Sequence, residues 1–227
     1  MTGAINGDLT LPAFENIHDM AWQSSPGQSV FRKRLHRVGG PESGQVTSVV
    51  RYEPGARFPA HDHPGGEEIL VLEGVFSDEH GDWPAGSYLL NPEGFRHAPF
   101  SESGCLIFVK LRQFPGTDRQ KVAIETHASP WLNGKITGVE SKLLYQQDGF
   151  ADSTWLERWS PGASCVLDVT RLGLELFVLE GSINTAERQY SEGSWLRLPH
   201  GTSLVLGSEN GCTLYVKRDG FGYLRSA

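Results

Sequence analysis

Three histidines and one glutamate stand in the first half of this 227-residue chain at spacings that can bring them together. The sequence reads His61-Asp62-His63, then Glu67 four residues after the second histidine, and His97 thirty residues further on. Neutral imidazole nitrogens and one carboxylate oxygen suit iron, manganese, nickel, copper or zinc. The four residues are therefore a candidate site for one divalent metal ion.

The surrounding residues indicate how the chain positions these side chains. Residues two apart on a strand face the same side, so His61 and His63 point together if residues 61–63 form a strand. The turn residues Pro64-Gly65-Gly66 can return the chain to bring Glu67 to the start of the next strand. An isolated histidine pair in such a segment is more often solvated or hydrogen-bonded than metal-bound. The interpretation therefore rests on all four residues.

The chain also repeats itself, with a constant offset of 107 residues that holds from about residue 51 to residue 111. A chance similarity of glycine turns would not maintain one offset through hydrophobic, charged and cysteine positions. We therefore interpret the chain as two copies of one unit. The matching segments are Pro54-Gly55-Ala56 with Pro161-Gly162-Ala163, Val71-Leu72-Glu73-Gly74 with Val178-Leu179-Glu180-Gly181, Gly86-Ser87 with Gly193-Ser194, and Val109-Lys110 with Val216-Lys217.

Comparison with the second copy helps to decide which residues of the first copy are ligands. Glu68 competes with Glu67 for the ligand role, but Glu68 has a counterpart in Glu175, so Glu68 is expected to serve folding. The four candidate ligands change together in the second copy. We expect the second copy to be a scaffold without metal, and a metal-free small-molecule pocket there is the alternative. The counterparts of His61, His63, Glu67 and His97 are Asp168, Thr170, Leu174 and Leu204.

Short apolar runs such as 69–72 and 106–109 have the length of buried strands, and glycine, proline and acidic clusters separate them. No stretch longer than ten residues has a helical period. This pattern predicts an all-β sandwich or barrel for each copy. The first fifty residues are less regular and are expected to add edge strands or an arm.

Composition limits the cellular compartment and the kinds of partner to be expected. The three cysteines, Cys105, Cys165 and Cys212, form neither a CxxC pair nor an even disulfide framework. The N-terminus lacks the pattern of a signal peptide, and no apolar run approaches the length of a membrane span. The net charge of -7, without a basic block, argues against nucleic acid as a partner. We expect a cytoplasmic protein that binds neither a membrane nor nucleic acid.

The spacings resemble the two cupin motifs. Gly55-x5-His61-x-His63-x3-Glu67-x6-Gly74 matches the first motif at every position, and Gly86-x5-Pro92-x-Gly94-x2-His97 matches the second except at its closing asparagine, where Ser101 stands. In cupins the three histidines and the glutamate bind one metal ion, which implies that role for His61, His63, Glu67 and His97. The resemblance predicts two tandem cupin (double-stranded β-helix or jelly-roll) barrels, a metal-binding lobe at 1–118 and a lobe without ligands at 119–227.

Residues 20–115 are more specifically similar to the cupin domain of ChrR-type anti-sigma factors, through segments 51–55, 63–68, 74–82 and 107–113. That cupin domain binds zinc and responds to singlet oxygen or organic peroxides. ChrR proteins also have an N-terminal His-x3-Cys-x2-Cys zinc motif that holds the sigma factor. No cysteine precedes Cys105 in this chain, so sigma-factor binding is not expected here.

Two functions follow from these resemblances. The first is a ChrR-like sensor or regulatory protein without the anti-sigma domain, whose single metal ion is zinc by resemblance. The second is an iron-dependent dioxygenase acting on a small diketone or hydroxyketone, as in related small cupins; a metal-assisted isomerase is a third. Manganese or nickel also fits the ligands. A small-molecule ligand or substrate is compatible with each case, and a homo-oligomer also remains open.

Overall fold

The computed structural model describes residues 3–27, 29–40, 42–169 and 171–227. The chain folds as two compact units. Unit 1 contains Met20–Ala128 together with the described residues before Asp8 and after Gly222. Unit 2 contains Asp8–Asp19 and Ser129–Gly222. Within the described residues the secondary structure is strand and short 3-10 helix, so the all-β prediction is confirmed, and no helix there is long and apolar enough to cross a membrane.

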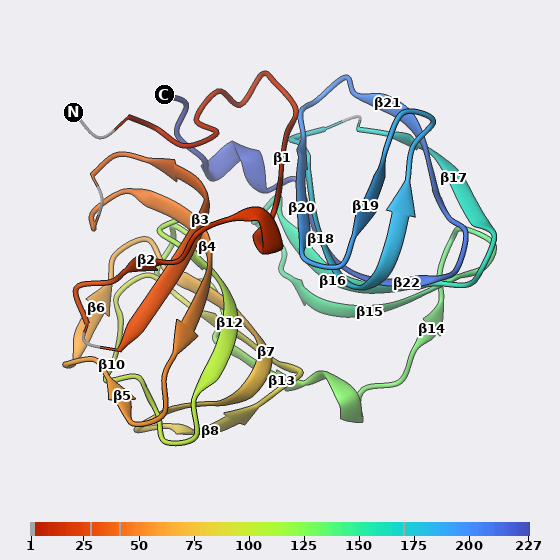
Figure 1. Cartoon of the computed structure of the whole chain (residues 1–227). Helices are drawn as coiled ribbons and strands as arrows, with labels where there is room; N and C mark the ends of the chain where they lie inside the picture. Colours follow the sequence, from red (N-terminus) through yellow and green to blue (C-terminus); the bar gives the residue numbers. More distant parts are fainter. Residues whose placement is uncertain (1–2, 28, 41, 170) are drawn as a thin grey trace. The chain divides into compact units, whose positions relative to one another are not determined.

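Unit 1 is a barrel whose main sheet has the strand order β13-β9-β7-β12-β4-β3-β2. In Figure 1 these strands run from orange to green. The short strands β5, β8 and β11 extend this sheet, and β6 pairs with β10 as a separate ribbon. The elements are β2 (Gln23–Ser24), β3 (Val30–Val38), β4 (Gln45–Tyr52), β5 (Ala56–Arg57), β6 (His61–His63), β7 (Glu67–Asp78), β8 (Gly81–Pro84), β9 (Ser87–Asn91), β10 (Phe95–His97), β11 (Phe100–Ser101), β12 (Cys105–Leu111), β13 (Val122–Glu125) and the 3-10 helix Thr126–Ala128.

Unit 2 repeats this order as β1-β20-β18-β22-β16-β15-β14, in green to blue with β1 in red (Figure 1). The strands β17, β19 and β21 extend it. The elements are β1 (Ala13–Asn16), β14 (Leu132–Asn133), β15 (Val139–Gln146), β16 (Ser153–Trp159), β17 (Ala163–Asp168), β18 (Leu174–Asn184), β19 (Gln189–Ser191), β20 (Ser194–Leu198), β21 (Ser203–Ser208), β22 (Cys212–Arg218), and the 3-10 helices Ile17–Asp19 and Gly220–Tyr223.

Each unit is completed by a strand from outside its own repeat. The arm strand β1 pairs with β20 of unit 2, and β13, which follows the first repeat, pairs with β9 of unit 1. Each added strand covers an edge whose backbone N–H and C=O groups would otherwise lack partners.

The repeat has a physical basis in shared turns and shared core positions. Gly74 and its counterpart Gly181 both have positive φ, +70° and +72°, where the long strands β7 and β18 bend. A Cβ atom at Gly74 would lie 2.1 Å from the backbone oxygen of Gly104, so only glycine fits. Inward-facing aliphatic residues of the central strands form a separate hydrophobic core in each unit.

Candidate metal centre

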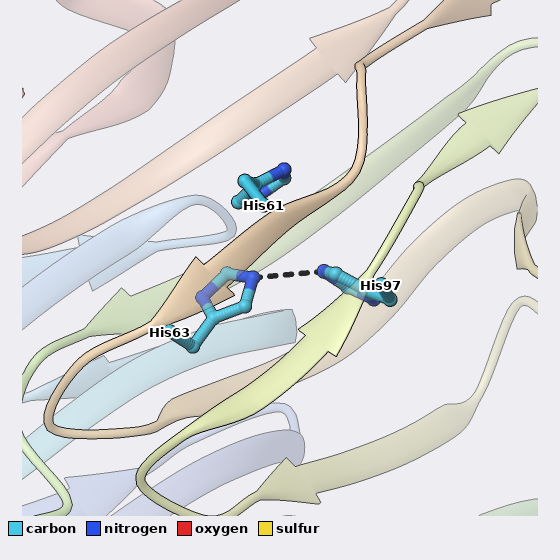
Figure 2. A group of neighbouring side chains, drawn as sticks. All are labelled: His61, His63 and His97. Atoms are coloured by element: carbon cyan, nitrogen blue, oxygen red, sulfur yellow. Dashed lines mark hydrogen bonds between the residues drawn. The ribbon is translucent and has the colours of Figure 1, made fainter.

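The ribbon of β6 and β10 brings the three histidines together. His61 lies directly opposite His97 in this antiparallel pair, and His63, two residues further along β6, faces the same side. His63 Nε2 and His97 Nε2 are 2.8 Å apart, as Figure 2 shows. One ring nitrogen from each of His61, His63 and His97 lies within 4.8 Å of the others, so the group could hold a metal ion.

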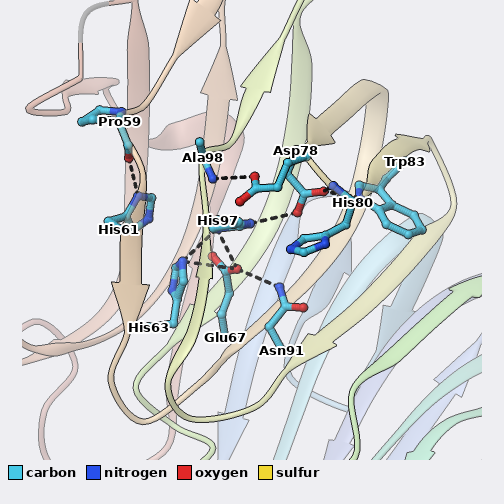
Figure 3. Close-up of polar contacts among 11 residues, drawn as sticks. Pro59, His61, His63, Glu67, Asp78, His80, Trp83, Asn91, His97 and Ala98 are labelled. Carbon is cyan, nitrogen blue, oxygen red and sulfur yellow. Dashed lines mark hydrogen bonds and ion pairs between the residues drawn. The ribbon is translucent and has the colours of Figure 1, made fainter.

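Glu67 joins this group from the first position of β7. Its Oε2 atom lies 3.7 Å from His63 Nε2 and 3.5 Å from His97 Nε2 (Figure 3). Glu67, His63 and His97 are all buried, with relative exposures of 5%, 6% and 0%. The structure therefore brings the three histidines together and places the Glu67 carboxylate beside His63 and His97.

The spacing of these atoms fits a transition metal. Nitrogen and oxygen ligands bind such ions at about 2.0–2.2 Å, which separates neighbouring ligand atoms by about 3 Å. The distances of 2.8, 3.5 and 3.7 Å among the Nε2 and Oε2 atoms are close to that separation. Three nitrogens and one carboxylate also leave coordination positions open for a small molecule.

Three further groups orient the candidate ligands, and the sequence analysis gave none of them a role. His97 Nδ1 donates to Asp78 Oδ2 at 3.0 Å, His61 Nδ1 lies 2.9 Å from the backbone oxygen of Pro59, and Asn91 Nδ2 donates to Glu67 Oε2 at 3.1 Å. Such partners leave the Nε2 lone pairs pointing inward. The sequence does contain an indication of these roles, because the second copy, which lacks the ligands, has Thr185 in place of Asp78 and Leu198 in place of Asn91.

The electrostatics differ between the two buried histidines. Burial, together with the charges of His97 and His61, lowers the pKa of His63 despite the nearby Glu67. Burial also acts to lower the pKa of His97, but the hydrogen bond to Asp78 and the negative charges of Glu67 and Asp78 outweigh it and raise that pKa. Burial acts to raise the pKa of Asp78, but the hydrogen bonds from His97, His80 and Trp83 together with the charge of His97 outweigh it and lower that pKa. These directions favour the neutral imidazole at His63, which is the form that binds a metal ion, and the protonated form at His97 in the metal-free protein.

A pocket of about 410 Å³ opens beside these residues inside unit 1. His61, His63 and Glu67 form part of its wall. The rest of the wall is mainly apolar, and the strands β4 and β12 provide a large part of it. Apolar lining residues include Val46, Val50, Phe58, Ile107, Val109 and Leu111. An apolar cavity with a few converging polar groups is typical of a small-molecule site.

Unit 2 lacks these donors at the equivalent positions. Leu174 is buried in the core, and Leu204 packs against that core. Asp168 is exposed and accepts a hydrogen bond from Ser203. Thr170 lies outside the described residues. Among the described residues, the three histidines of unit 1 are the one group of three His, Cys, Asp or Glu side chains close enough to hold an ion.

The neighbouring glutamates Glu68 and Glu175 are equivalent in the structure as well as in the sequence. Tyr88 donates its hydroxyl hydrogen to Glu68 Oε1 at 2.5 Å. In unit 2, Trp195 Nε1 donates to Glu175 Oε1 at 2.7 Å. Both glutamates are buried against an aromatic donor on the adjacent strand, so this pair belongs to the shared framework.

Comparison with protein families gives one match that extends over most of the chain. The model of the ChrR cupin-like domain matches residues 12–115 and again residues 119–221. The chain belongs to this family, with two copies of its domain. No curated protein sequence matches the chain.

Solved structures establish the cupin fold. A putative dioxygenase from Nostoc punctiforme has a TM-score of 0.76 at 16% identity, covering 95% of this chain and 86% of that protein. Protein YlbA from E. coli has a TM-score of 0.68 at 15% identity, covering 93% and 90%. The bacterial pirin YhhW from Escherichia coli, in complex with nickel(II), has a TM-score of 0.67 at 14% identity, covering 96% and 100%.

Proposed function

We propose that unit 1 is a metal-dependent dioxygenase that cleaves a carbon–carbon bond in a small diketone or hydroxyketone. The proposed ligands of its single metal ion are His61, His63, Glu67 and His97. The observation that carries this proposal is the convergence of three imidazoles and one carboxylate beside an apolar pocket of about 410 Å³. A pocket of this kind can hold a small carbon skeleton and exclude water from it.

Iron in this site would supply both Lewis acidity toward the substrate oxygens and redox chemistry with dioxygen, whereas zinc would supply only the first. The chain's own residues position the ligands and the substrate. Asp78 holds the proton on His97 Nδ1 and so keeps Nε2 available, and Asn91 fixes the orientation of Glu67. The apolar walls from β4 and β12 hold the substrate carbon atoms. The reaction consumes one dioxygen per diketone and yields a carboxylic acid and a dicarbonyl fragment.

Two of the similar structures support this proposal. One is named a putative dioxygenase, and another, a pirin, is in complex with nickel(II). Both share the fold of this chain at low identity, so they support metal chemistry in this scaffold without specifying the substrate.

A regulatory role is the second candidate, and the family match favours it. In that case zinc orders the site, and an oxidised small molecule in the same pocket alters the metal environment. The ligands are the same in both proposals, so metal identity separates them: zinc has no redox chemistry, and iron has.

The test is elemental analysis of anaerobically purified protein, followed by oxygen-electrode assays with pentane-2,4-dione and its hydroxyketone analogues. We expect iron and an oxygen uptake that His61→Ala abolishes and the matched unit 2 variant Asp168→Ala leaves unchanged. Zinc, with no oxygen uptake after iron reconstitution, would contradict the enzymatic proposal and leave the regulatory one.

A further inference from the structure

The wall of the unit 1 pocket includes two arginines that the proposed dioxygenase chemistry does not use. Arg32 on β3 and Arg112, just after β12, both line the pocket. Arg34, two residues after Arg32, meets the same carboxylate as Arg32. Glu42 Oε2 lies 3.3 Å from Arg32 Nη1, and Glu42 Oε1 lies 3.4 Å from Arg34 Nη2.

These ion pairs are loose, because charge-assisted bonds are commonly about 2.7–2.9 Å long. The Glu42 side chain is 51% exposed, whereas those of Arg32 and Arg34 are 13% and 8% exposed. An exposed partner of this kind contributes little and can be exchanged. Glu42 is therefore a replaceable anion above two nearly buried guanidinium groups.

The other acidic residues of the pocket are already engaged. Glu67 belongs to the candidate metal centre, and Asp62 pairs with Arg96 at 3.1 Å. Burial, followed by the positive charge of Arg32, lowers the pKa of Arg34, and burial lowers the pKa of Arg112. Both directions indicate guanidinium groups that are less hydrated than they would be in water, despite the nearby charge of Glu42.

Two buried donor atoms of pocket residues, one on β4 and one on β3, have no hydrogen-bond acceptor. Ser48 is fully buried on β4, lines the pocket, and its Oγ atom has no hydrogen-bond partner. The Nε atom of Arg32 is buried and likewise without a partner. Native proteins rarely leave such groups unsatisfied, because a buried donor without an acceptor loses its hydrogen bonds to water without replacement. The pocket therefore offers donors that fit an incoming oxygen acceptor.

Strand register gives the separation along the sheet between the backbone positions of these residues and that of Glu67. Leu111 lies opposite Glu67 and opposite Val46 in the sheet. Ser48 and Val50 follow Val46 on the same face of β4, and Arg32 lies opposite Val50. At roughly 3.4 Å per residue, the row of Ser48 is about 7 Å along the strand from the row of Glu67, and the row of Arg32 about 13 Å.

We infer that the pocket recognises a small organic acid whose carboxylate displaces Glu42, binds Arg32 and Ser48, and leaves the oxygen-bearing end at the metal centre. This inference rests on the proposed function for the identity of that second end. The Arg32 guanidinium, whose Nη2 also donates to Ser25 Oγ, can bind a carboxylate through two parallel hydrogen bonds, and Ser48 can donate a third. The substrate class is thus an anionic diketone or hydroxyketone, with the carboxylate separated from the metal-binding oxygens.

The test compares two probes that differ only in this charge, 4,6-dioxoheptanoate and its methyl ester, on cobalt-loaded protein. Cobalt absorption reports binding at the metal, and calorimetry gives the affinity. We expect the acid to bind about tenfold to hundredfold more tightly than the ester. Arg32→Gln should remove that preference with metal content unchanged, and Arg32→Lys should restore it in part.

Two variants serve as controls. Arg57→Gln removes an arginine of unit 1 that pairs with exposed Glu102 outside the pocket, and it should keep the full preference. Glu42→Gln removes the competing carboxylate and should tighten binding of the acid severalfold. A folding defect cannot produce tighter binding. A gain of affinity in Glu42→Gln would therefore be due to the removed carboxylate and not to a change in folding.

Equal affinity for acid and ester in the wild type, or an unchanged preference in Arg32→Gln, would overturn the inference. Failure of the protein to take up any metal would instead contradict the proposed function. In that case, glutarate binding to the metal-free protein tests the inference by itself. Binding that Arg32→Gln abolishes supports it, and absence of binding overturns it.

Discussion

The two units share a framework but differ in the ribbon that carries the ligands. In unit 1, Pro59 and Pro99 interrupt this ribbon, which consists of β5 and β6 against β10 and β11, and His61 pairs with His97. In unit 2, β17 and β21 form a continuous ribbon in which Asp168 pairs with Ser203. The counterpart of His97, Leu204, pairs one residue away, with Leu167.

Proline explains this difference in register. It has no N–H to donate to a ladder, so Pro59 and Pro99 break the pairing and let the register shift by one residue. Unit 2 has Val166 and Leu206 at these positions, and its ladder runs through them. A shift of one residue turns every following side chain to the other face. The site of unit 1 therefore depends on the interruption as well as on its ligands.

The two barrels also differ in the side chains that fill their interiors. Trp155 stands at the position of Ser48 and packs against the core of unit 2. Glu157 and Arg218 stand at the positions of Val50 and Leu111 and form an ion pair of 2.8 Å. Unit 2 thus places a large ring and a salt bridge where unit 1 has a polar donor and apolar walls. The same fold therefore accommodates both interiors. The residues that form the site are not the ones that the fold itself requires.

The largest difference between the two units is expected in the metal affinity of variants at His97 and at its counterpart Leu204. His97→Ala should weaken metal binding by more than the roughly hundredfold that loss of an outer hydrogen-bond partner costs, because a ligand itself is removed. Leu204→Ala should leave metal affinity unchanged and lower the free energy of unfolding by about 1–2 kcal/mol, because a half-buried side chain is shortened. Competition with a chelating dye measures the affinity. Equal losses of metal in both variants would refute a site confined to unit 1.

Variants at Asp78 and at its counterpart Thr185 test whether the hydrogen-bond partner of His97 contributes to metal binding. Asp78→Ala should weaken metal binding about tenfold to hundredfold, because His97 loses the acceptor that fixes its ring. Thr185→Ala should not change it. The same dye competition applies, and an unchanged affinity in Asp78→Ala would show that the hydrogen bond of 3.0 Å does not orient His97.

The shared framework predicts similar effects in both units at Tyr88 and Trp195. Tyr88→Phe removes the hydrogen bond to buried Glu68 and should destabilise the protein by about 1–3 kcal/mol. Trp195→Phe removes the corresponding bond to Glu175 and should cost at least as much, since the ring is also smaller. Urea unfolding measures both, and neither variant should lose metal. A loss in one unit alone would contradict their equivalence.

The smallest expected effect is a pH dependence of the metal-free protein, centred on His97 and Asp78. The raised pKa of His97 adds stability that is present below pH 6.5 and lost as the pH rises through its folded value. The lowered pKa of Asp78 adds stability that is present above pH 3.8 and lost as the pH falls through its folded value. The stability difference between wild type and Asp78→Asn should therefore be largest near pH 5, at about 1 kcal/mol, and shrink toward pH 8. A difference that grows toward pH 8 would contradict this assignment.

Short-range patterns in the sequence predicted the all-β fold and the common orientation of His61 and His63, whereas the resemblance to the cupin motifs implied that Glu67 and His97 join them. A strand alternates its faces, and Pro64-Gly65-Gly66 forms the predicted turn before Glu67. The contacts of Asp78 with His97, and of Arg32 with Glu42, join residues whose approach depends on strand register and side-chain orientation. The pairing of the arm strand β1 with β20 also spans most of the chain, and no local pattern specifies it.

Native mass spectrometry of the wild-type protein, titrated with a divalent metal ion under non-denaturing conditions, tests the central claim most directly. Unit 1 brings together three imidazoles and a carboxylate, and unit 2 has leucines at two of the equivalent positions. We therefore expect one metal ion per chain, and none in His97→Ala. Two ions per chain in the wild type, or none at all, would contradict the account.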